Sequence, residues 1–250
     1  MIRSRVRPRR ALAAAILCFP LVCGAQEQSP IPLKSEPHHH LVLHNDFVNV
    51  YSVQVQPKDS VLLHKHEFDA IGIMLNDAEI TVSGPGKPAA HHKVVGGQLR
   101  LQQAGYVHST VIDGNSAYRN VTVELLLPQQ EGRNVCASVI PAQPLNCPSA
   151  QADSAALSEQ PQFETNQTKI NLIRLKPQQS VTLDASAQSR LVVMLDDTVI
   201  VTAENSPPKT LRGGDILWLD VNSPAEIFKN DGSKEMRLVT FVFTNEQSAK

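Results

Sequence analysis

The fold is decided by two segments of the sequence, Leu63-His64-Lys65-His66-Glu67 and Gly97-Gln98-Leu99-Arg100-Leu101-Gln102-Gln103-Ala104-Gly105-Tyr106-Val107-His108. Successive side chains of a β-strand point to opposite faces, so His64 and His66 share a face, about 7 Å apart along the strand. The second segment alternates, turns at glycine and supplies one more histidine, His108. Imidazoles on one face can share a metal ion when a neighbouring strand adds a ligand. The two segments therefore predict a metal site made of His64, His66 and His108.

The chain from residue 38 onward also favours β-structure. Apolar residues fall into short alternating runs, for example residues 48–50, 71–75 and 121–127, and groups of Pro, Gly, Asn and Asp separate the runs. No long stretch has a helical period. Many short strands joined by regular turns predict an all-β barrel or sandwich.

The sequence contains an internal repeat. Pro57-Lys58-Asp59-Ser60-Val61-Leu62-Leu63 aligns with Pro177-Gln178-Gln179-Ser180-Val181-Thr182-Leu183. Ile73-Met74-Leu75-Asn76-Asp77 aligns with Val193-Met194-Leu195-Asp196-Asp197 at the same offset, and Gly96-Gly97 aligns with Gly213-Gly214. A repeat of this length indicates two copies of one folding unit.

The histidine pair, the glycine–histidine segment and the repeat together resemble the cupin superfamily, whose small barrels hold a metal inside. The resemblance implies an all-β chain with two tandem cupin-type β-barrels (the double-stranded β-helix or jelly-roll), a bicupin of the exported bacterial kind. The second copy has Asp184 and Ser186 in place of the histidine pair, and Ala225 falls opposite His108. The first barrel is thus expected to hold the metal, and the second to be a degenerate copy.

The first motif departs from the cupin pattern at its acidic position. Cupins usually place a glutamate three or four residues after the histidine pair, and this chain has Ala70 there. Asp69, beside the empty position, and Glu124, on a later strand, are the candidate fourth ligands. Asp69 would reach the site only if the hairpin shifted by one residue, because strand alternation otherwise turns it outward.

A three-histidine site without the acid resembles those of the thiol dioxygenases and a diketone-cleaving dioxygenase within the superfamily. The resemblance implies one divalent metal, iron first, with manganese, zinc, copper or nickel as alternatives, and dioxygenase-like chemistry on a small anionic or enolisable substrate. Ala70 and Gly72 would leave space for that small-molecule ligand, and Tyr106 is a candidate hydrogen-bond donor to it, or a rim residue at the barrel mouth. The alternative functions are a non-catalytic small-molecule- or partner-binding cupin of the cell envelope, and a barrel whose histidines only line a polar pocket.

The remaining histidines of the nine lie between His38 and His92. The run of residues 38–40 is expected on a strand edge with two of its three side chains solvated; a flexible zinc- or copper-capturing cluster with His44 is the alternative. His91 and His92 are expected at the surface.

The N-terminus has the anatomy of a secretory signal peptide. Five arginines between Arg3 and Arg10 precede an apolar run of about 12 residues, and Cys23-Gly24-Ala25 suits cleavage near Ala25. The run is shorter than the ~20 residues that a membrane-spanning helix needs. An uncleaved anchor is the alternative. We therefore expect a periplasmic or secreted protein with no stable membrane span after cleavage.

The predicted divisions of the chain follow from these segments. Cys136 and Cys147 would remain after cleavage, and an even pair in an exported chain predicts a disulfide, with free thiols or a metal pair as alternatives.

Residues 152–157 could form a short helix. The divisions are a signal peptide at 1–25, a tether at 26–37, the first barrel at 38–128, a linker with the disulfide loop at 129–162 and the second barrel at 163–250.

Composition excludes some partners and leaves others open. The formal net charge is -1, with 42% hydrophobic and 19% charged residues. This balance gives no electrostatic reason to expect nucleic-acid binding. A homodimer is compatible with the fold class, since cupins often pair through strand exchange or sheet packing.

Overall fold

The computed structural model describes residues 29–148, 158–197, 199–203 and 207–244. The predicted signal peptide (1–25) and the predicted helix at 152–157 lie outside the described residues. Within the described part the chain forms twenty strands and one short 3-10 helix, with no α-helix. The all-β prediction is confirmed. None of the described helices is long and apolar enough to cross a membrane.

The first barrel is built from two five-stranded sheets, in the orders β1-β4-β9-β6-β7 and β2-β3-β10-β5-β8. Its elements are β1 (Ile31–Pro32), the 3-10 helix η1 (Leu33–Ser35), β2 (His39–His44), β3 (Val48–Val55), β4 (Ser60–Lys65), β5 (Asp69–Met74), β6 (Ala78–Gly84), β7 (Lys87–Val94), β8 (Leu99–Gln102), β9 (Val107–Ile112) and β10 (Tyr118–Leu125).

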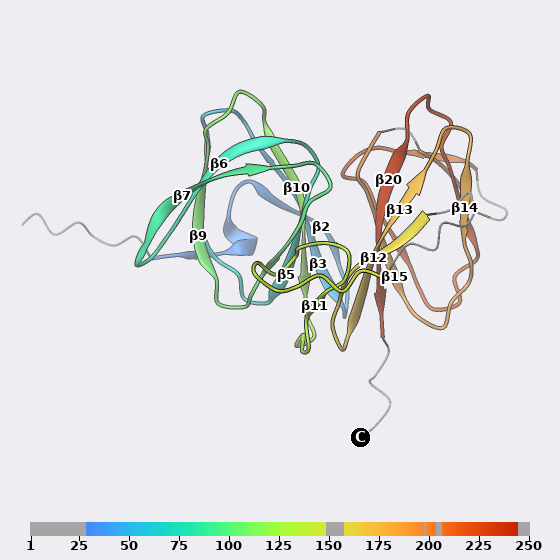
Figure 1. The fold of residues 1–250 in the computed structure, drawn as a ribbon, viewed down its shortest axis with the longest axis horizontal. Helices are drawn as coiled ribbons and strands as arrows, with labels where there is room; N and C mark the ends of the chain where they lie inside the picture. The colour runs from blue at the N-terminus through green and yellow to red at the C-terminus, as the bar shows by residue number, and fades with distance from the viewer. Residues whose placement is uncertain (1–28, 149–157, 198, 204–206, 245–250) are drawn as a thin grey trace, which may run out of the picture.

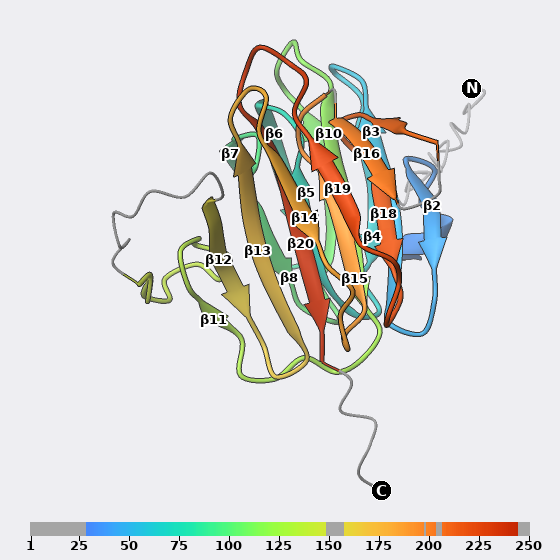
Figure 2. The same ribbon diagram turned by 90° about the vertical axis from the view of Figure 1, so that its right-hand side faces the viewer.

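The second barrel repeats this plan with a six-stranded sheet, β11-β12-β13-β20-β15-β18, and a four-stranded sheet, β14-β19-β16-β17. Figure 2 shows the larger sheet face on. Its strands are β11 (Arg133–Asn134), β12 (Ser158–Glu164), β13 (Thr168–Leu175), β14 (Ser180–Leu183), β15 (Arg190–Met194), β16 (Val199–Ala203), β17 (Lys209–Leu211), β18 (Ile216–Leu219), β19 (Glu226–Lys229) and β20 (Met236–Phe243).

The predicted repeat is visible in the backbone. Lys58 and Gln178, at equivalent turns of the two barrels, have left-handed φ angles of 68° and 64°. Gly97 and Gly214, also equivalent, have φ angles of 92° and 98°, a conformation that glycine adopts at no steric cost. Sequence similarity between the two halves therefore corresponds to similarity of local conformation.

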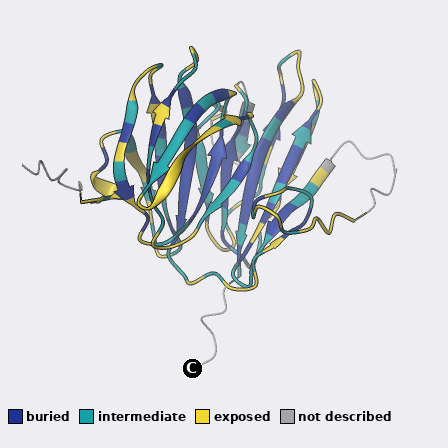
Figure 3. Ribbon diagram, turned by 60° about the vertical axis from the view of Figure 1, so that its left-hand side comes forward, coloured by how far each residue is buried: buried dark blue, intermediate teal, exposed yellow. Residues whose placement is uncertain are grey.

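The two barrels pack face to face through one shared hydrophobic core (Figure 1). Odd-numbered residues of β5 and β10, such as Ile71 and Val123, meet Phe163 and Phe241 of the second barrel, and all four are fully buried. Phe47 also contacts Trp218, with ring centroids 5.6 Å apart. Figure 3 shows the buried strands meeting in the middle of the molecule.

Reciprocal hydrogen bonds join the barrels at the edge of this core. Arg119 of the first barrel donates to the Gly213 carbonyl of the second at 2.8 Å. Arg237 of the second donates to the Gly96 carbonyl of the first at 3.1 Å, and it is held by Asp196 through a bidentate pair. Equivalent residues of the repeat thus make the same contact in both directions.

The predicted tether at 26–37 is partly built into the first barrel. Residues 31–32 form β1, which pairs in parallel with β4 and sets Ile31 opposite His64. Leu33 and Glu36 are buried, with exposed fractions of 1% and 2%. Residues 31–36 therefore form an ordered strap along the barrel rather than a free linker. The sequence did not indicate this because three prolines interrupt any strand period.

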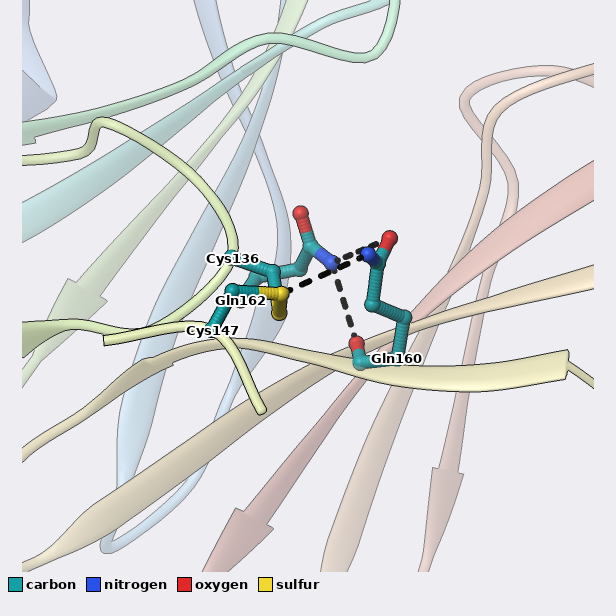
Figure 4. The surroundings of a disulfide bond; sticks show 4 residues. All are labelled: Cys136, Cys147, Gln160 and Gln162. Carbon is teal, nitrogen blue, oxygen red and sulfur yellow. Dashed lines mark hydrogen bonds between the residues drawn. A yellow bond between two sulfur atoms is a disulfide. The ribbon is translucent and has the colours of Figure 1, made fainter. Parts of the chain in front are cut away.

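The predicted linker at 129–162 is likewise part of the fold. β12 begins at Ser158 and belongs to the large sheet of the second barrel, and β11 pairs with it. The Cys136–Cys147 disulfide closes the loop between them (Figure 4). The Cys136 N–H donates to the Pro161 carbonyl of β12 at 3.1 Å. Inside the loop the buried Asn134 side chain bonds the backbone of Val139 and Ile140.

Because the barrels share a core, a cavity made in one should weaken both. We expect Phe241→Ala to lower the free energy of unfolding by about 3–5 kcal/mol. Peptides from both barrels should lose hydrogen-exchange protection together. Ile227→Ala, which removes a side chain of a residue 43% exposed, is the control and should change stability little. Loss of protection confined to the second barrel would contradict the shared core.

Candidate metal centre

The three predicted histidines come together inside the first barrel. His64 lies on β4 and His108 on β9, directly opposite each other in the antiparallel pair. His66 follows the end of β4, and its N–H donates to the Tyr106 carbonyl at 2.9 Å. The three are 1%, 1% and 8% exposed. Each offers a ring nitrogen within 4.8 Å of the other two, and in the described part of the chain this is the one group of three or more potential ligands that meets that limit.

A β-bulge turns His64 into the barrel. Val61 points inward, so strict alternation along β4 would send His64 outward. The register shifts between Val61 and His64, which inserts one extra residue. Leu62, in the bulge, is 43% exposed, and the residues after it are turned over. Bulges commonly re-aim side chains at functional sites.

The hydrogen bonds of the rings fix which nitrogens face the centre. Nδ1 of His64 lies 2.9 Å from the Leu62 carbonyl, which can only accept, so Nδ1 carries the proton and Nε2 keeps its lone pair. Nε2 of His64 is buried and has no partner among the described residues. Nδ1 of His108 lies 3.4 Å from the Thr110 hydroxyl. Two of the three rings therefore present Nε2 to the centre.

The spacing of these nitrogens suits one bound ion. Nε2 of His66 and Nε2 of His108 are 3.1 Å apart. Two nitrogens each about 2.1 Å from one ion would be separated by about 3.0 Å at a right angle and about 3.4 Å at the tetrahedral angle. The orphaned Nε2 of His64 supplies a third buried lone pair. These residues fit a metal ion with three imidazole ligands.

Burial keeps all three imidazoles neutral, as metal binding requires. It lowers the pKa of His64 to about 4, of His66 to about 3 and of His108 to about 2. The nearby positive charge of other histidines lowers the pKa of His66 and His108 further. Each imidazole therefore keeps one unprotonated ring nitrogen over the whole neutral range.

A buried carboxylate from the strap supports the bulge. Oε1 of Glu36 accepts the Leu62 N–H at 3.1 Å, which satisfies the donor that the bulge leaves unpaired. Oε2 accepts from His38 N–H at 2.8 Å and lies 2.7 Å from Nδ1 of His39. Burial alone would raise the pKa of Glu36, but hydrogen bonds from His39, His38 and Leu62 outweigh it and lower the pKa to about 2. Glu36 thus acts on His64 through Leu62.

His39 approaches the centre, which the sequence did not indicate. Its side chain is only 6% exposed, and its ring centroid lies 5.0 Å from that of His64. The ring also meets Tyr51 edge-on at 6.3 Å. Two of the three side chains of residues 38–40 were expected to be solvated, but only His40 is exposed. The signal that could have found it is Glu36, three residues earlier, which holds its Nδ1.

Neither candidate fourth ligand joins the histidines. Asp69 lies opposite Leu125, whose side chain faces the shared core, and Oδ1 of Asp69 accepts the Ala104 N–H at 2.8 Å. The hairpin shift that would bring it inward does not occur. Glu124 does face the barrel interior, but Asn49 and Tyr51 donate to its carboxylate at 2.9 and 3.3 Å. Burial raises the pKa of Glu124.

The predicted pocket residues take three different places. Ala70 is fully buried and lies opposite Glu124. A Cβ added at Gly72 would come within 3.3 Å of the Met74 side chain, so little space remains there. Tyr106 stacks on His108, with ring centroids 4.7 Å apart and planes inclined by 24°. Tyr106 is therefore the one of the three that contacts the centre directly.

Comparison with known proteins supports the fold and goes no further. No protein-family model and no curated protein sequence matches the chain. A putative glyoxylate-induced protein from Pseudomonas aeruginosa superposes with a TM-score of 0.57 at 13% identity, over 84% of this chain and 79% of that chain. A cupin 2 conserved barrel domain protein from Leptotrichia buccalis gives a TM-score of 0.50 at 9% identity, over 82% and 88%.

A third structure adds a named activity. A mutant of salicylate 1,2-dioxygenase from Pseudoaminobacter salicylatoxidans, in complex with gentisate, superposes with a TM-score of 0.54 at 11% identity, over 85% of this chain and 76% of that chain. At such identities a structural likeness shows the fold alone. The chain has the fold of the two-domain cupins.

Removing the charge of Glu36 should loosen the metal centre without unfolding the barrel. In Glu36→Gln one amide oxygen must replace two carboxylate oxygens, so either Leu62 or His39 loses its hydrogen-bond acceptor. Without its bond to Glu36, Leu62 no longer holds His64 in a fixed orientation. We expect metal affinity to fall about 10- to 100-fold, as for other groups that orient metal ligands. Asp59→Asn is the control, since that carboxylate is 53% exposed and bonds only the outer nitrogen of His38 and the N–H of Ser60, neither of which touches Leu62 or His64. Equal affinities of the two variants, by competition titration, would exclude the role of Glu36.

The same carboxylate predicts a pH dependence of stability. Folding lowers the pKa of Glu36 from 4.5 to about 2, so its stabilising contribution is complete above about pH 4.5 and is lost as the pH falls through about 2. The contribution at neutral pH is on the order of 3 kcal/mol. Urea unfolding of wild type and Glu36→Gln should therefore show a difference that shrinks below about pH 4.5. A difference independent of pH would mean that the carboxylate is not ionised in the fold.

Proposed function

We propose that this chain is an exported metal-dependent enzyme with dioxygenase-like chemistry on a small anionic or enolisable molecule. One divalent ion, iron first, with manganese, zinc, copper or nickel as alternatives, is held by His64, His66 and His108. The observation that carries the proposal is the convergence of three buried, neutral imidazoles, with the Nε2 lone pair of His64 left without a partner. A buried polar atom without a partner is costly unless a ligand satisfies it.

The ligand set indicates the class of chemistry. A bound ion supplies Lewis-acid polarisation of a coordinated molecule and, for a redox-active metal, electron transfer. Three neutral imidazoles leave the charge of the ion uncompensated, so an anionic or chelating molecule is favoured beside them. Tyr106, stacked on His108, covers one face of that ring.

The comparisons support this proposal at the level of the fold. Salicylate 1,2-dioxygenase, whose structure with gentisate has a similar fold, is named for its action on salicylate, an aromatic hydroxy acid. That protein shares 11% identity with this chain, so its substrate is a guide to chemical class only.

Export is supported by two separate features of the chain. Residues 1–25 carry the basic head, apolar run and small-residue end of a signal peptide. Cys136 and Cys147 form a disulfide, a bond that persists in oxidising compartments. Both agree with a periplasmic or secreted location.

A non-catalytic binding protein of the cell envelope is the second candidate. It is favoured by the missing motif glutamate at Ala70 and by the second barrel, where Asp184 and Ser186 replace the histidine pair. Such a protein would bind its small ligand equally well with and without metal. The enzyme would consume oxygen only when loaded with a redox-active ion.

Metal content tests the proposal directly. Wild-type protein exported to an oxidising compartment should contain about one equivalent of a transition metal by elemental analysis. His64→Ala/His66→Ala should contain none. His40→Ala/His44→Ala, which removes two exposed histidines, is the matched control and should keep the metal. Absence of metal from wild type, even after reconstitution, would move the function to the binding protein.

A further inference from the structure

A cavity of about 510 Å³ adjoins the metal centre on the side of β7 and β8. None of the lining residues is acidic, and the polar ones are Lys87, His92, Arg100, Gln102, Gln103 and Tyr106. The volume is in the range of small-molecule sites in proteins. The cavity is therefore a positively charged space large enough for a small organic ligand.

Arg100 is the central charge of this cavity. It lies opposite Gly72 in the pairing of β5 with β8, so its side chain shares the inner face of the barrel. The guanidinium of Arg100 has no hydrogen bond or ion pair among the described residues. By contrast, Arg119 donates to the Gly213 carbonyl and Arg237 to the Asp196 carboxylate. Arg100 and His92 line the same cavity, and after burial the positive charge of Arg100 is the largest cause that lowers the pKa of His92. An arginine that faces a cavity without a partner is suited to a carboxylate.

Gln102 is a second polar residue of the cavity that lacks a hydrogen-bond partner. Its Oε1 atom is buried and has no hydrogen-bond partner among the described residues. The side chain lies on the same face as Arg100, two residues further along β8. An acceptor of this kind would be satisfied by a hydroxyl or amino donor of a bound molecule.

The apolar part of the cavity lining comes partly from the disulfide loop. Ile140 and Pro141 line it together with Val82 and Leu101. The loop is docked on β8, where the Leu101 N–H donates to the Val139 carbonyl at 3.2 Å, and Val139 is buried in the shared core. The connector between the barrels thus supplies a surface against which carbon atoms of a ligand can pack.

Tyr106 separates the cavity from the metal ligands. One side of it lines the cavity, and its ring stacks on His108 and lies 6.2 Å from the ring of His66. The Lys87 ammonium lies 6.0 Å from the centre of the same ring. A molecule in the cavity would therefore be one aromatic ring away from the histidines.

We propose that this cavity is the substrate site, and that it selects a small carboxylate with a hydrogen-bond donor and an apolar part. Arg100 binds the carboxylate, Gln102 accepts from the donor, and Ile140 and Pro141 contact the apolar part. The proposal rests on the proposed function for its link to catalysis, because the cavity reaches the histidines only at Tyr106, which lines it and stacks on His108. Binding of the carboxylate itself needs no metal.

The test uses benzoate as the probe and benzamide, which has the same shape without the charge, as its neutral counterpart. Benzoate should bind metal-free, full-length protein, with chemical-shift changes in residues of β8, and benzamide should bind at least about tenfold more weakly. Arg100→Met should weaken benzoate about tenfold or more and leave benzamide unchanged, and Arg100→Lys should fall between. Lys93→Met removes an exposed charge outside the cavity and is the control. Benzoate affinity unchanged in Arg100→Met, or no benzoate binding to wild type, would overturn the proposal.

The same titration in His64→Ala/His66→Ala separates this proposal from the proposed function. Arg100-dependent binding that persists in this variant supports the cavity whether or not the wild type holds a metal. Benzoate binding that appears only when the wild type is loaded with metal, and that is lost in this variant and insensitive to Arg100→Met, would place the anion on the metal and overturn the cavity site, while the metal centre would stand. Thermal unfolding of each variant excludes misfolding as the cause.

Discussion

The candidate metal centre depends on the contact between the Glu36 carboxylate and the N–H of Leu62. A bulge leaves a backbone donor unpaired inside the protein, and such a donor is costly unless another group accepts from it. Glu36 accepts a hydrogen bond from the Leu62 N–H, and the Leu62 carbonyl in turn fixes the proton of His64 on Nδ1. One buried charge thus connects the ordered strap, the bulge and the orientation of a metal ligand.

The rest of the fold serves to keep this arrangement dry and rigid. The sheet β2-β3-β10-β5-β8 covers the centre on one side and is itself covered by the second barrel through the shared core. A barrel of this size would otherwise expose a wide apolar sheet to water. The second copy has lost its histidines and kept its apolar face, which agrees with a role in covering the first.

Much of this could be predicted from the sequence, because its signals are periodic or repeated. The alternation of apolar residues indicated β-structure, the repeat indicated two barrels, and the spacing of His64, His66 and His108 indicated their convergence. The bulge at Leu62 could not be predicted, since it is a local exception to the alternation on which the prediction rested. The roles of Glu36 and His39 depend on contacts between the strap and β4 that leave no periodic signal. Asp69 and Glu124 were candidate ligands because of their positions in the sequence. The pairing of β5 with β10 turns Asp69 toward the shared core, away from the histidines. Glu124 faces the barrel interior, but its carboxylate accepts hydrogen bonds from Asn49 and Tyr51.

The central claim is that three imidazoles and no carboxylate bind one ion inside the first barrel. Anomalous diffraction from crystals of the metal-loaded protein tests it most directly, because the signal locates the ion and its ligands together. The account predicts one peak about 2.1 Å from a ring nitrogen of each of His64, His66 and His108. A peak bound instead by the exposed histidines near His40 and His44, or one ligated by Glu124, would contradict it.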